Sequence, residues 1–180
     1  GVSVAIGHAA AHVAGADAVV YSSSIPPQNP ELVAARNLRI PTYPRAQVLA
    51  DCMAGTQGIA VSGSHGKTTT TTFIAAMLLE AGQDPTILGG GEVARFGGNA
   101  RVGRGPYVVV EADESDGSFV YLRPAIAVIT NIEEEHLDYY RNWGEILHAY
   151  QRFAQRVGPE GLVICGGDDP GVRRLLGSWP

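Results

Sequence analysis

Residues 58–77 read GIAVSGSHGKTTTTTFIAAM and predict a strand, a tight glycine-containing turn and a helix in direct succession. The strand is the apolar run 59–61, and the helix includes the apolar run 73–79. A turn of this kind points backbone N–H groups and a helix N-terminus at a phosphate group. We therefore expect a phosphate-binding loop (P-loop) here. The residues expected to contact ATP are Gly63, Ser64, His65, Gly66, Lys67, Thr68 and Thr69.

This loop departs from the general pattern G-x-x-x-x-G-K-[ST], because Val61 stands where the first glycine is expected. Gly63 supplies the flexible residue instead, so the predicted loop is more compact. Lys67 is the only lysine in a chain with 13 lysines and arginines. It would reach the terminal phosphates, while the Thr68 hydroxyl would bind Mg²⁺. The alternative interpretation is a glycine turn that merely precedes a helix.

The composition excludes several classes of protein. Apolar residues make up 45% of the 180 residues and charged residues 17%, which indicates a folded core. A net charge of −5 without a basic run argues against a nucleic-acid partner. No apolar run approaches the roughly 20 residues of a membrane span. Cys52 and Cys165 are too few for a disulfide framework, which predicts a reducing, cytoplasmic setting.

Strand-like and helix-like segments alternate along the chain. The expected strands are 2–6, 18–21, 59–61, 85–88, 107–110, 124–129 and 161–165. The expected helices are 30–37, 45–53, 141–157, 170–176 and the one that follows the P-loop. This alternation predicts an α/β fold with a mostly parallel sheet and helices on both faces. Residues 89–105 hold seven glycines, and we expect a flexible surface loop there.

The chain is long enough for one large domain or parts of two. Residues 55–58 are the best candidate for a domain boundary, although a linker near Pro44 is also compatible with the sequence. We therefore expect one unit at 1–54 and a second at 55–180.

Polar clusters follow three of the predicted strands: the P-loop, residues 111–116 (EADESD) and residues 131–138 (NIEEEHLD). The last two hold eight of the 18 acidic residues, a charge density that cations would have to offset. Ligands of parallel sheets bind at such strand ends. Glu111 ends an apolar strand, as an acid near Mg²⁺ does in ATPases, which makes it the first candidate carboxylate ligand. His136 is either a metal ligand or a capped structural histidine.

Together, these motifs resemble the Mur ligases, the ATP-dependent, amide-forming enzymes of peptidoglycan synthesis. The resemblance rests on residues 62–70 (SGSHGKTTT), 111–116 and 130–138, and it covers nearly the whole chain in the same order. His65 within the loop and the EADESD stretch favour the branch of the family that adds alanine.

The resemblance implies three domains, which bind a UDP-sugar, bind ATP and close over the nucleotide. Residues 1–54 would be the end of a Rossmann-like UDP-sugar domain, and residues 55–180 an incomplete central ATP-binding domain. The C-terminal ligase domain would be absent.

Roles follow from the same resemblance, residue by residue. Lys67, Glu111 and His136 would be catalytic. Thr68 and Glu111 would bind a first Mg²⁺, and His136 a second. The implied substrate contacts are His8, Ser22, Ser115 and Asn131.

The implied reaction joins L-alanine to the carboxylate of UDP-N-acetylmuramate through an acyl phosphate made from ATP. Three alternatives stay open at this point. The first is a family member that recycles a murein tripeptide, and the second is another P-loop small-molecule kinase. The third is a chain that by itself only binds nucleotide.

Overall fold

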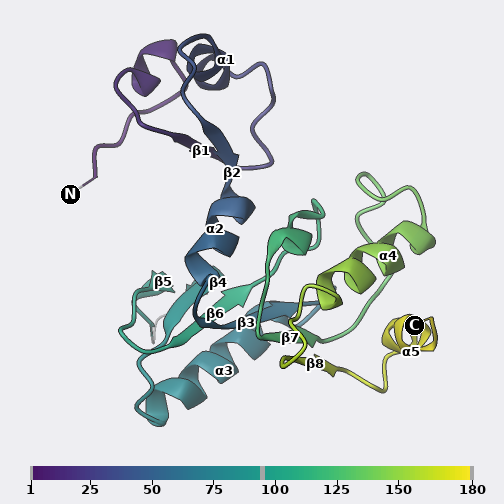
Figure 1. Ribbon diagram of the computed structural model, residues 1–180. Helices are drawn as coiled ribbons and strands as arrows, with labels where there is room; N and C mark the ends of the chain where they lie inside the picture. The colour runs from purple at the N-terminus through teal and green to yellow at the C-terminus, as the bar shows by residue number, and fades with distance from the viewer. Residues whose placement is uncertain (1, 94–95, 179–180) are drawn as a thin grey trace. The chain divides into compact units, whose positions relative to one another are not determined.

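The computed structural model of the chain describes residues 2–93 and 96–178. The chain forms two compact units, Gly1–Leu49 and Ala50–Pro180 (Figure 1). The division falls a few residues before the boundary expected from the sequence. None of the described helices is both long and apolar enough to cross a membrane.

The first unit contains a two-stranded parallel sheet. Its elements are η1 (Ala10–Val13), β1 (Val19–Tyr21), α1 (Pro30–Asn37) and β2 (Thr42–Pro44). Helix α2, Arg45–Met53, follows and contains the division between the units. The Asn29 side chain accepts a hydrogen bond from the Glu31 N–H at 2.9 Å and so caps α1, as its place before Pro30 predicts.

The strand predicted at residues 2–6 is absent. Val2, Val4 and Ile6 are more than four-fifths exposed, and no strand of the described residues pairs with them. Apolar side chains favour a strand only where a neighbouring strand takes up the backbone hydrogen bonds. That partner is missing from the described part of the chain.

The second unit is built on a six-stranded sheet in the order β5-β4-β6-β3-β7-β8. The strands are β3 (Gln57–Ser62), β4 (Thr86–Val93), β5 (Gly98–Arg101), β6 (Tyr107–Glu111), β7 (Ile126–Ile129) and β8 (Leu162–Cys165). Every pairing is parallel except that of β4 with β5. The prediction of a mostly parallel α/β sheet is therefore confirmed.

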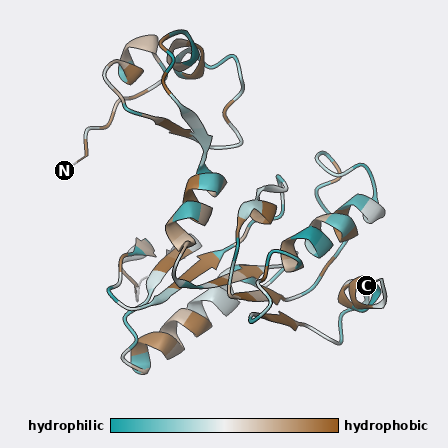
Figure 2. Ribbon diagram, viewed as in Figure 1, coloured by the Kyte–Doolittle hydropathy of each residue, from teal (hydrophilic) through white to brown (hydrophobic). Residues whose placement is uncertain are grey.

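Helices cover this sheet from both sides (Figure 1). Helix α3, Lys67–Glu80, contacts β3, β4 and β6 on one face. The short η3 (Ser118–Tyr121) and α4 (Trp143–Ala154) lie on the other face, and α5 (Pro170–Gly177) contacts α4. Figure 2 shows that the strands between these layers are predominantly hydrophobic.

Central strands form most of the core. Val61, Val109, Val110, Ala127 and Ile129 are fully buried, as expected for parallel strands covered on both faces. A second apolar cluster joins η3 to α4. In it, the Phe119 ring lies 5.2 Å from Tyr150 and 5.0 Å from Phe153, between ring centroids.

The glycine-rich segment is not the flexible loop that its composition predicts. Strand β4 continues through Gly89, Gly90 and Gly91 to Val93, and its residues from Ile87 onward pair with β5 in antiparallel fashion. Strand β5 has the sequence GNAR, which has low strand propensity, so sequence patterning missed it. Its formation depends on the edge that β4 offers.

The sheet order determines what meets at its carboxyl edge. Strand β3 lies between β6 and β7. The P-loop that follows β3 is therefore flanked by the acidic stretch after β6 and by the polar stretch after β7.

Candidate active site

The P-loop turns sharply between β3 and α3. Gly63 has a φ of 138°, and a Cβ atom there would lie 2.0 Å from Thr130 Oγ1. Gly66 precedes the first residue of α3 and has a φ of 82°. Both angles disfavour residues with a side chain, and the first position also lacks room. The backbone therefore approaches the neighbouring strand closely at Gly63.

The segment after β7 is hydrogen-bonded to this loop. The Asn131 side chain bonds to both backbone polar groups of His65: its Oδ1 accepts from the N–H at 2.8 Å, and its Nδ2 donates to the carbonyl at 2.9 Å. The Thr130 hydroxyl donates to the same carbonyl at 2.7 Å. The Ser64 N–H donates to the Asn131 carbonyl at 3.1 Å. These four hydrogen bonds fix the loop to the segment after β7.

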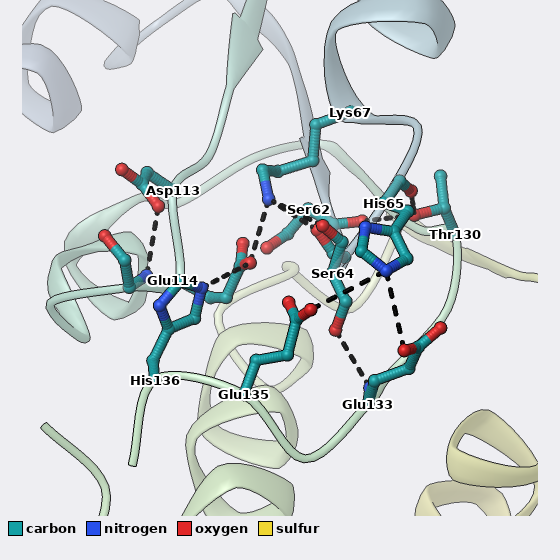
Figure 3. A network of polar contacts seen from close by, with 12 residues as sticks. Ser62, Ser64, His65, Lys67, Asp113, Glu114, Thr130, Glu133, Glu135 and His136 are labelled. Atoms are coloured by element: carbon teal, nitrogen blue, oxygen red, sulfur yellow. Dashed lines mark hydrogen bonds and ion pairs between the residues drawn. The ribbon is translucent and has the colours of Figure 1, made fainter. Parts of the chain in front are cut away.

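Lys67 folds back across the loop that it follows (Figure 3). Its Nζ donates to the Gly63 carbonyl at 2.7 Å and to Glu114 Oε1 at 2.8 Å. The lysine side chain is 16% exposed and that of Glu114 only 3%. This buried carboxylate was not among the predicted site residues.

Glu111 and Thr68 border the same pair of glycines. The Gly90 N–H donates to Glu111 Oε2 at 2.9 Å, and a Cβ at Gly90 would lie 2.4 Å from the other carboxylate oxygen. A Cβ at Gly91 would lie 3.9 Å from the Thr68 methyl group. The glycine-rich strand β4 thus leaves space for the Glu111 carboxylate beside the start of α3.

His136 occupies a turn with an unusual backbone. Its φ is 56°, and its carbonyl accepts hydrogen bonds from the Tyr139 and Tyr140 N–H groups, both at 2.9 Å. Positive φ in a residue other than glycine is uncommon and often marks functional positions. The imidazole Nε2 lies 3.5 Å from Glu114 Oε1. Tyr140 Oη in turn donates to the Glu114 carbonyl at 2.6 Å.

The predicted metal ligands can be tested against the chemistry of the site. Oxygen donors suit Mg²⁺, so the Thr68 hydroxyl and the Glu111 carboxylate fit this ion. His136 offers a nitrogen, which suits softer ions better. Within the described part of the chain, buried Glu114 Oε2 has no hydrogen-bond partner, which leaves an oxygen donor available beside His136.

A different group of side chains meets the simple geometric requirement for a metal site. Among the described residues, the group of His65, Glu133 and Glu135 brings its ligand atoms within 4.8 Å of one another. His65 Nε2 lies 3.5 Å from Glu133 Oε2 and 3.6 Å from Glu135 Oε1. All three side chains are more than a third exposed. Neither Glu111 nor His136 belongs to this group.

Two further predicted residues, His8 and Ser22, lie in the first unit. His8 and His12 each place Nδ1 on one oxygen of Glu31, at 2.8 and 2.7 Å, and these contacts hold the Glu31 pKa below its ordinary value. Ser22 Oγ lies 3.0 Å from Ser24 Oγ.

In the second unit, Ser115 follows the acidic strand end, where its N–H donates to Asp113 Oδ1 at 3.0 Å. The substrate contacts proposed for His8, Ser22, Ser115 and Asn131 stay predictions.

Sequence reasoning missed two residues that organise the site, Glu114 and Gly90. Both lie in segments that stand out in the sequence, EADESD and the glycine-rich residues 89–105. Nothing in the spacing of EADESD tells which carboxylate turns inward. Glu114 is held in its buried position by the Gly117 N–H at the start of η3 and by the Tyr140 hydroxyl, which both bond to its carbonyl. Tyr140 lies 26 residues away in the sequence, so the pattern of EADESD does not reveal this contact.

Two family models match the chain. The Mur ligase middle domain matches residues 61–178, and the catalytic domain of the Mur ligase family matches residues 1–57. The chain is 52% identical over its whole length to UDP-N-acetylmuramate--L-alanine ligase of Sorangium cellulosum, and 51% identical over 98% of its length to the one of Methylibium petroleiphilum. It spans 38% of the length of each of these relatives.

Solved structures give the same result. UDP-N-acetylmuramate-alanine ligase MurC from Thermotoga maritima superposes with a TM-score of 0.84 and 31% identity, covering 94% of this chain and 40% of that one. UDP-N-acetylmuramate:L-alanyl-gamma-D-glutamyl-meso-diaminopimelate ligase from Neisseria meningitides reaches a TM-score of 0.87, also with 31% identity, over 95% of this chain and 59% of that one. Both family models and these relatives match the chain along its length, and the P-loop lies within the matched region. The chain therefore belongs to the Mur ligase family.

Proposed function

We propose that the chain supplies the nucleotide-binding and carboxylate-activating part of an ATP-dependent ligase that joins L-alanine to UDP-N-acetylmuramate. The observation that carries this proposal is the identity of about half of all residues, over nearly the whole chain, with relatives of that name. Residues 1–54 would contribute to the UDP-sugar site and residues 55–180 to the ATP site. The chain spans only 38% of such relatives, so the complete activity requires segments that they possess in addition.

The P-loop would hold the β- and γ-phosphates of ATP. Its backbone N–H groups and the N-terminus of α3 provide partial positive charge, and the Lys67 ammonium adds a full one. Asn131 and Thr130 already hold the His65 backbone in place, so little ordering is needed when the phosphates bind. Preorganised charge of this kind stabilises the transferring phosphoryl group.

Thr68, Glu111 and His136 would hold Mg²⁺, which supplies charge neutralisation on the phosphate oxygens. The Gly90 N–H holds one oxygen of the Glu111 carboxylate in place. The turn at His136 keeps its imidazole beside Glu114. The chain would thus bring donors from three strand ends to one place.

The reaction itself would proceed in two steps. A carboxylate oxygen of UDP-N-acetylmuramate attacks the γ-phosphorus, ADP leaves, and an acyl phosphate forms. The L-alanine amine then attacks the acyl carbon, and the C–O bond breaks as phosphate leaves with its electron pair. Alignment of the two reactants contributes much of the acceleration, because effective molarities of about 10⁵ M or more are reached by well-oriented groups.

A chimaeric enzyme tests this proposal. In it, this chain replaces the matching 38% of the Sorangium cellulosum relative, so that the remaining segments are supplied. We expect phosphate release from ATP that requires both UDP-N-acetylmuramate and L-alanine, with the unaltered relative as the control. If the folded chimaera binds ATP but releases no phosphate that depends on both substrates, the proposal fails.

The likeness to the Neisseria meningitides ligase favours a second candidate, a ligase that attaches a peptide such as L-alanyl-γ-D-glutamyl-meso-diaminopimelate instead of alanine. The same chimaera cannot separate them if the relative's own segments select the amine. We therefore propose a second chimaera that places this chain in the Neisseria ligase. If the chain itself selects the amine, both chimaeras will prefer the same one.

Two other functions give different results. A small-molecule kinase would transfer phosphate to a stable product without any need for an amine. A chain that only binds nucleotide would show ATP binding alone and no contribution to turnover in either chimaera. The cytoplasmic setting expected from the two cysteines stays a prediction.

A further inference from the structure

Glu114 is the most enclosed carboxylate of the described residues at the strand ends, and no role follows for it from the proposed reaction. Its side chain is 3% exposed, whereas that of Lys67 is 16% and that of His136 is 35% exposed. A single oxygen, Oε1, lies 2.8 Å from Lys67 Nζ and 3.5 Å from His136 Nε2 (Figure 3). The carboxylate therefore joins the P-loop lysine to the turn after β7.

Two hydrogen bonds hold the backbone of Glu114 in place. Its carbonyl accepts from Tyr140 Oη at 2.6 Å and from the Gly117 N–H at 3.0 Å. Tyr140 is itself buried, and burial raises the pKa of its phenol, so it stays a neutral donor. Glu114 cannot follow Lys67 far if the lysine moves.

Lys67 cannot serve all of its present partners and a phosphate at once. Its Nζ bonds to the Gly63 carbonyl at 2.7 Å and to the Ser64 carbonyl at 3.4 Å, both within the loop where a phosphate group would sit. It also bonds to Glu114 Oε1 at 2.8 Å, so three acceptors surround the ammonium. An ammonium has three donors, and a phosphate competes for them as a strong, charged acceptor. Removing a cation from a buried carboxylate leaves an uncompensated charge, which is unfavourable until another cation replaces it.

We propose that Glu114 is a positioning residue of the nucleotide site: it holds the Lys67 ammonium across the P-loop and loses it to the phosphates when ATP binds. This inference rests on the proposed function, because it requires the loop to bind ATP. Glu114, with its second oxygen unpartnered among the described residues and His136 nearby, is then available for a cation that arrives with the nucleotide.

The first test is ATP binding measured by calorimetry in the presence of EDTA. The variant Glu114→Gln removes the charge that competes for Lys67 and nearly preserves the shape of the side chain. We expect the variant to bind metal-free ATP about tenfold more tightly, the equivalent of about 1.4 kcal/mol. Equal or weaker binding by a folded variant would overturn the inference.

A matched control distinguishes competition for the Lys67 ammonium from the general effect of removing a negative charge near the loop. Glu133 also lies beside the loop, since its N–H donates to Ser64 Oγ at 2.9 Å, but its side chain is 53% exposed and its carboxylate pairs with His65 instead of Lys67. Solvent screens such a charge, so Glu133→Gln should increase affinity by less than about threefold. A gain equal to that of Glu114→Gln would contradict a specific role for Glu114.

The second test observes Lys67 directly. Because it is the only lysine in the chain, labelling with [¹³Cε]lysine gives one side-chain NMR signal. Without nucleotide, this signal should differ between the wild-type chain and Glu114→Gln. With saturating ATP in EDTA, the two signals should coincide, because phosphate has replaced the carboxylate.

The wild-type spectrum alone keeps the inference testable if the variant does not fold. A wild-type signal that does not move while calorimetry records ATP binding would refute this inference and leave the proposed function intact. A folded wild-type chain that binds no ATP would refute both.

Discussion

Gly63 and Gly66 both adopt positive φ angles in the P-loop, but their surroundings differ. A Cβ at Gly63 would collide with Thr130 Oγ1, whereas a Cβ at Gly66 would meet no atom within 4 Å. Gly66→Ala should therefore cost only the backbone strain of about 1 kcal/mol in the free energy of unfolding. Gly63→Ala should cost about 2 kcal/mol more, because of the collision. Urea denaturation of both variants measures this difference, and equal losses would contradict the close approach at Gly63.

Gly90 and Gly91 offer a similar comparison for the Glu111 carboxylate. A side chain at position 90 would displace this carboxylate, while one at position 91 would make only an ordinary contact with Thr68. Displacement by about 1 Å can reduce turnover about 100-fold. We therefore expect phosphate release by the chimaera to fall by about that factor in Gly90→Ala and to stay close to wild type in Gly91→Ala. A reversed order would place the important carboxylate elsewhere.

At the scale of residues, the sequence indicated which residues are candidates for the site better than it indicated which contacts they make. The P-loop pattern singles out Lys67 and Thr68 as candidates, because few other arrangements require a lysine directly after such a turn, and their roles stay predictions. The same pattern does not reveal that Lys67 pairs with Glu114 across 47 residues of sequence. Such a contact depends on how strands order themselves in the sheet, which short-range patterns do not determine.

At the scale of elements, the contact between the P-loop and the segment after β7 depends on Asn131. Its amide makes two hydrogen bonds with the His65 backbone, each worth about 1 kcal/mol. Asn131→Ala should loosen the loop and weaken ATP binding by about tenfold or more in calorimetry. Asn131→Asp keeps the acceptor but places an anionic oxygen against the His65 carbonyl and near the phosphates, so it should weaken binding at least as much as the alanine variant. Unchanged affinity in both would show that the loop needs no support from the Asn131 side chain.

The edge formed by β4 and β5 contains a charged clamp that gives stability a pH dependence. The Arg101 guanidinium, followed by the Arg104 backbone N–H, holds the pKa of Asp84 below its ordinary value of 3.8. A lowered pKa means that the ionised carboxylate stabilises the fold above about pH 4, and that this contribution is lost as the pH falls through the native pKa. Asp84→Asn should therefore reduce the free energy of unfolding at pH 7.

The difference between Asp84→Asn and the wild type should shrink as the pH is lowered below about 4, where the wild-type carboxyl also loses its charge. Urea titrations at several pH values measure it. Asp51→Asn, at an exposed position of α2, is the control and should show little difference at any pH. A difference that grows toward low pH would contradict the assigned direction of the pKa shift.

Elements differed in how far the sequence could predict them. Helices α1 and α5 were predicted closely, since Asn29-Pro30 and Asp169-Pro170 combine a capping side chain with a proline at the first helical position. The expected strand at 2–6 was wrong and β5 was missed. Helix signals are local, whereas a strand depends on the partner beside it, so the errors fell on strands.

At the scale of the whole molecule, the proposed function depends on the order of the strands. Because β3 lies between β6 and β7, Glu111 at the end of β6 and the segments that follow β3 and β7, which carry Lys67 and His136, lie at the same edge of the sheet. The general rule that ligands bind at the carboxyl ends of parallel strands predicted this convergence. The strand order itself came from the structure, because connections of similar length permit several orders.

We propose that the side chains at this edge of the sheet together activate a carboxylate of the substrate. The most direct measurement follows ¹⁸O from the carboxylate of UDP-N-acetylmuramate, using the chimaera with ATP and L-alanine. An acyl phosphate breaks between carbon and oxygen, so we predict that one carboxylate ¹⁸O appears in the released phosphate, observed by ³¹P NMR. Phosphate released during amide formation without any ¹⁸O would contradict the account.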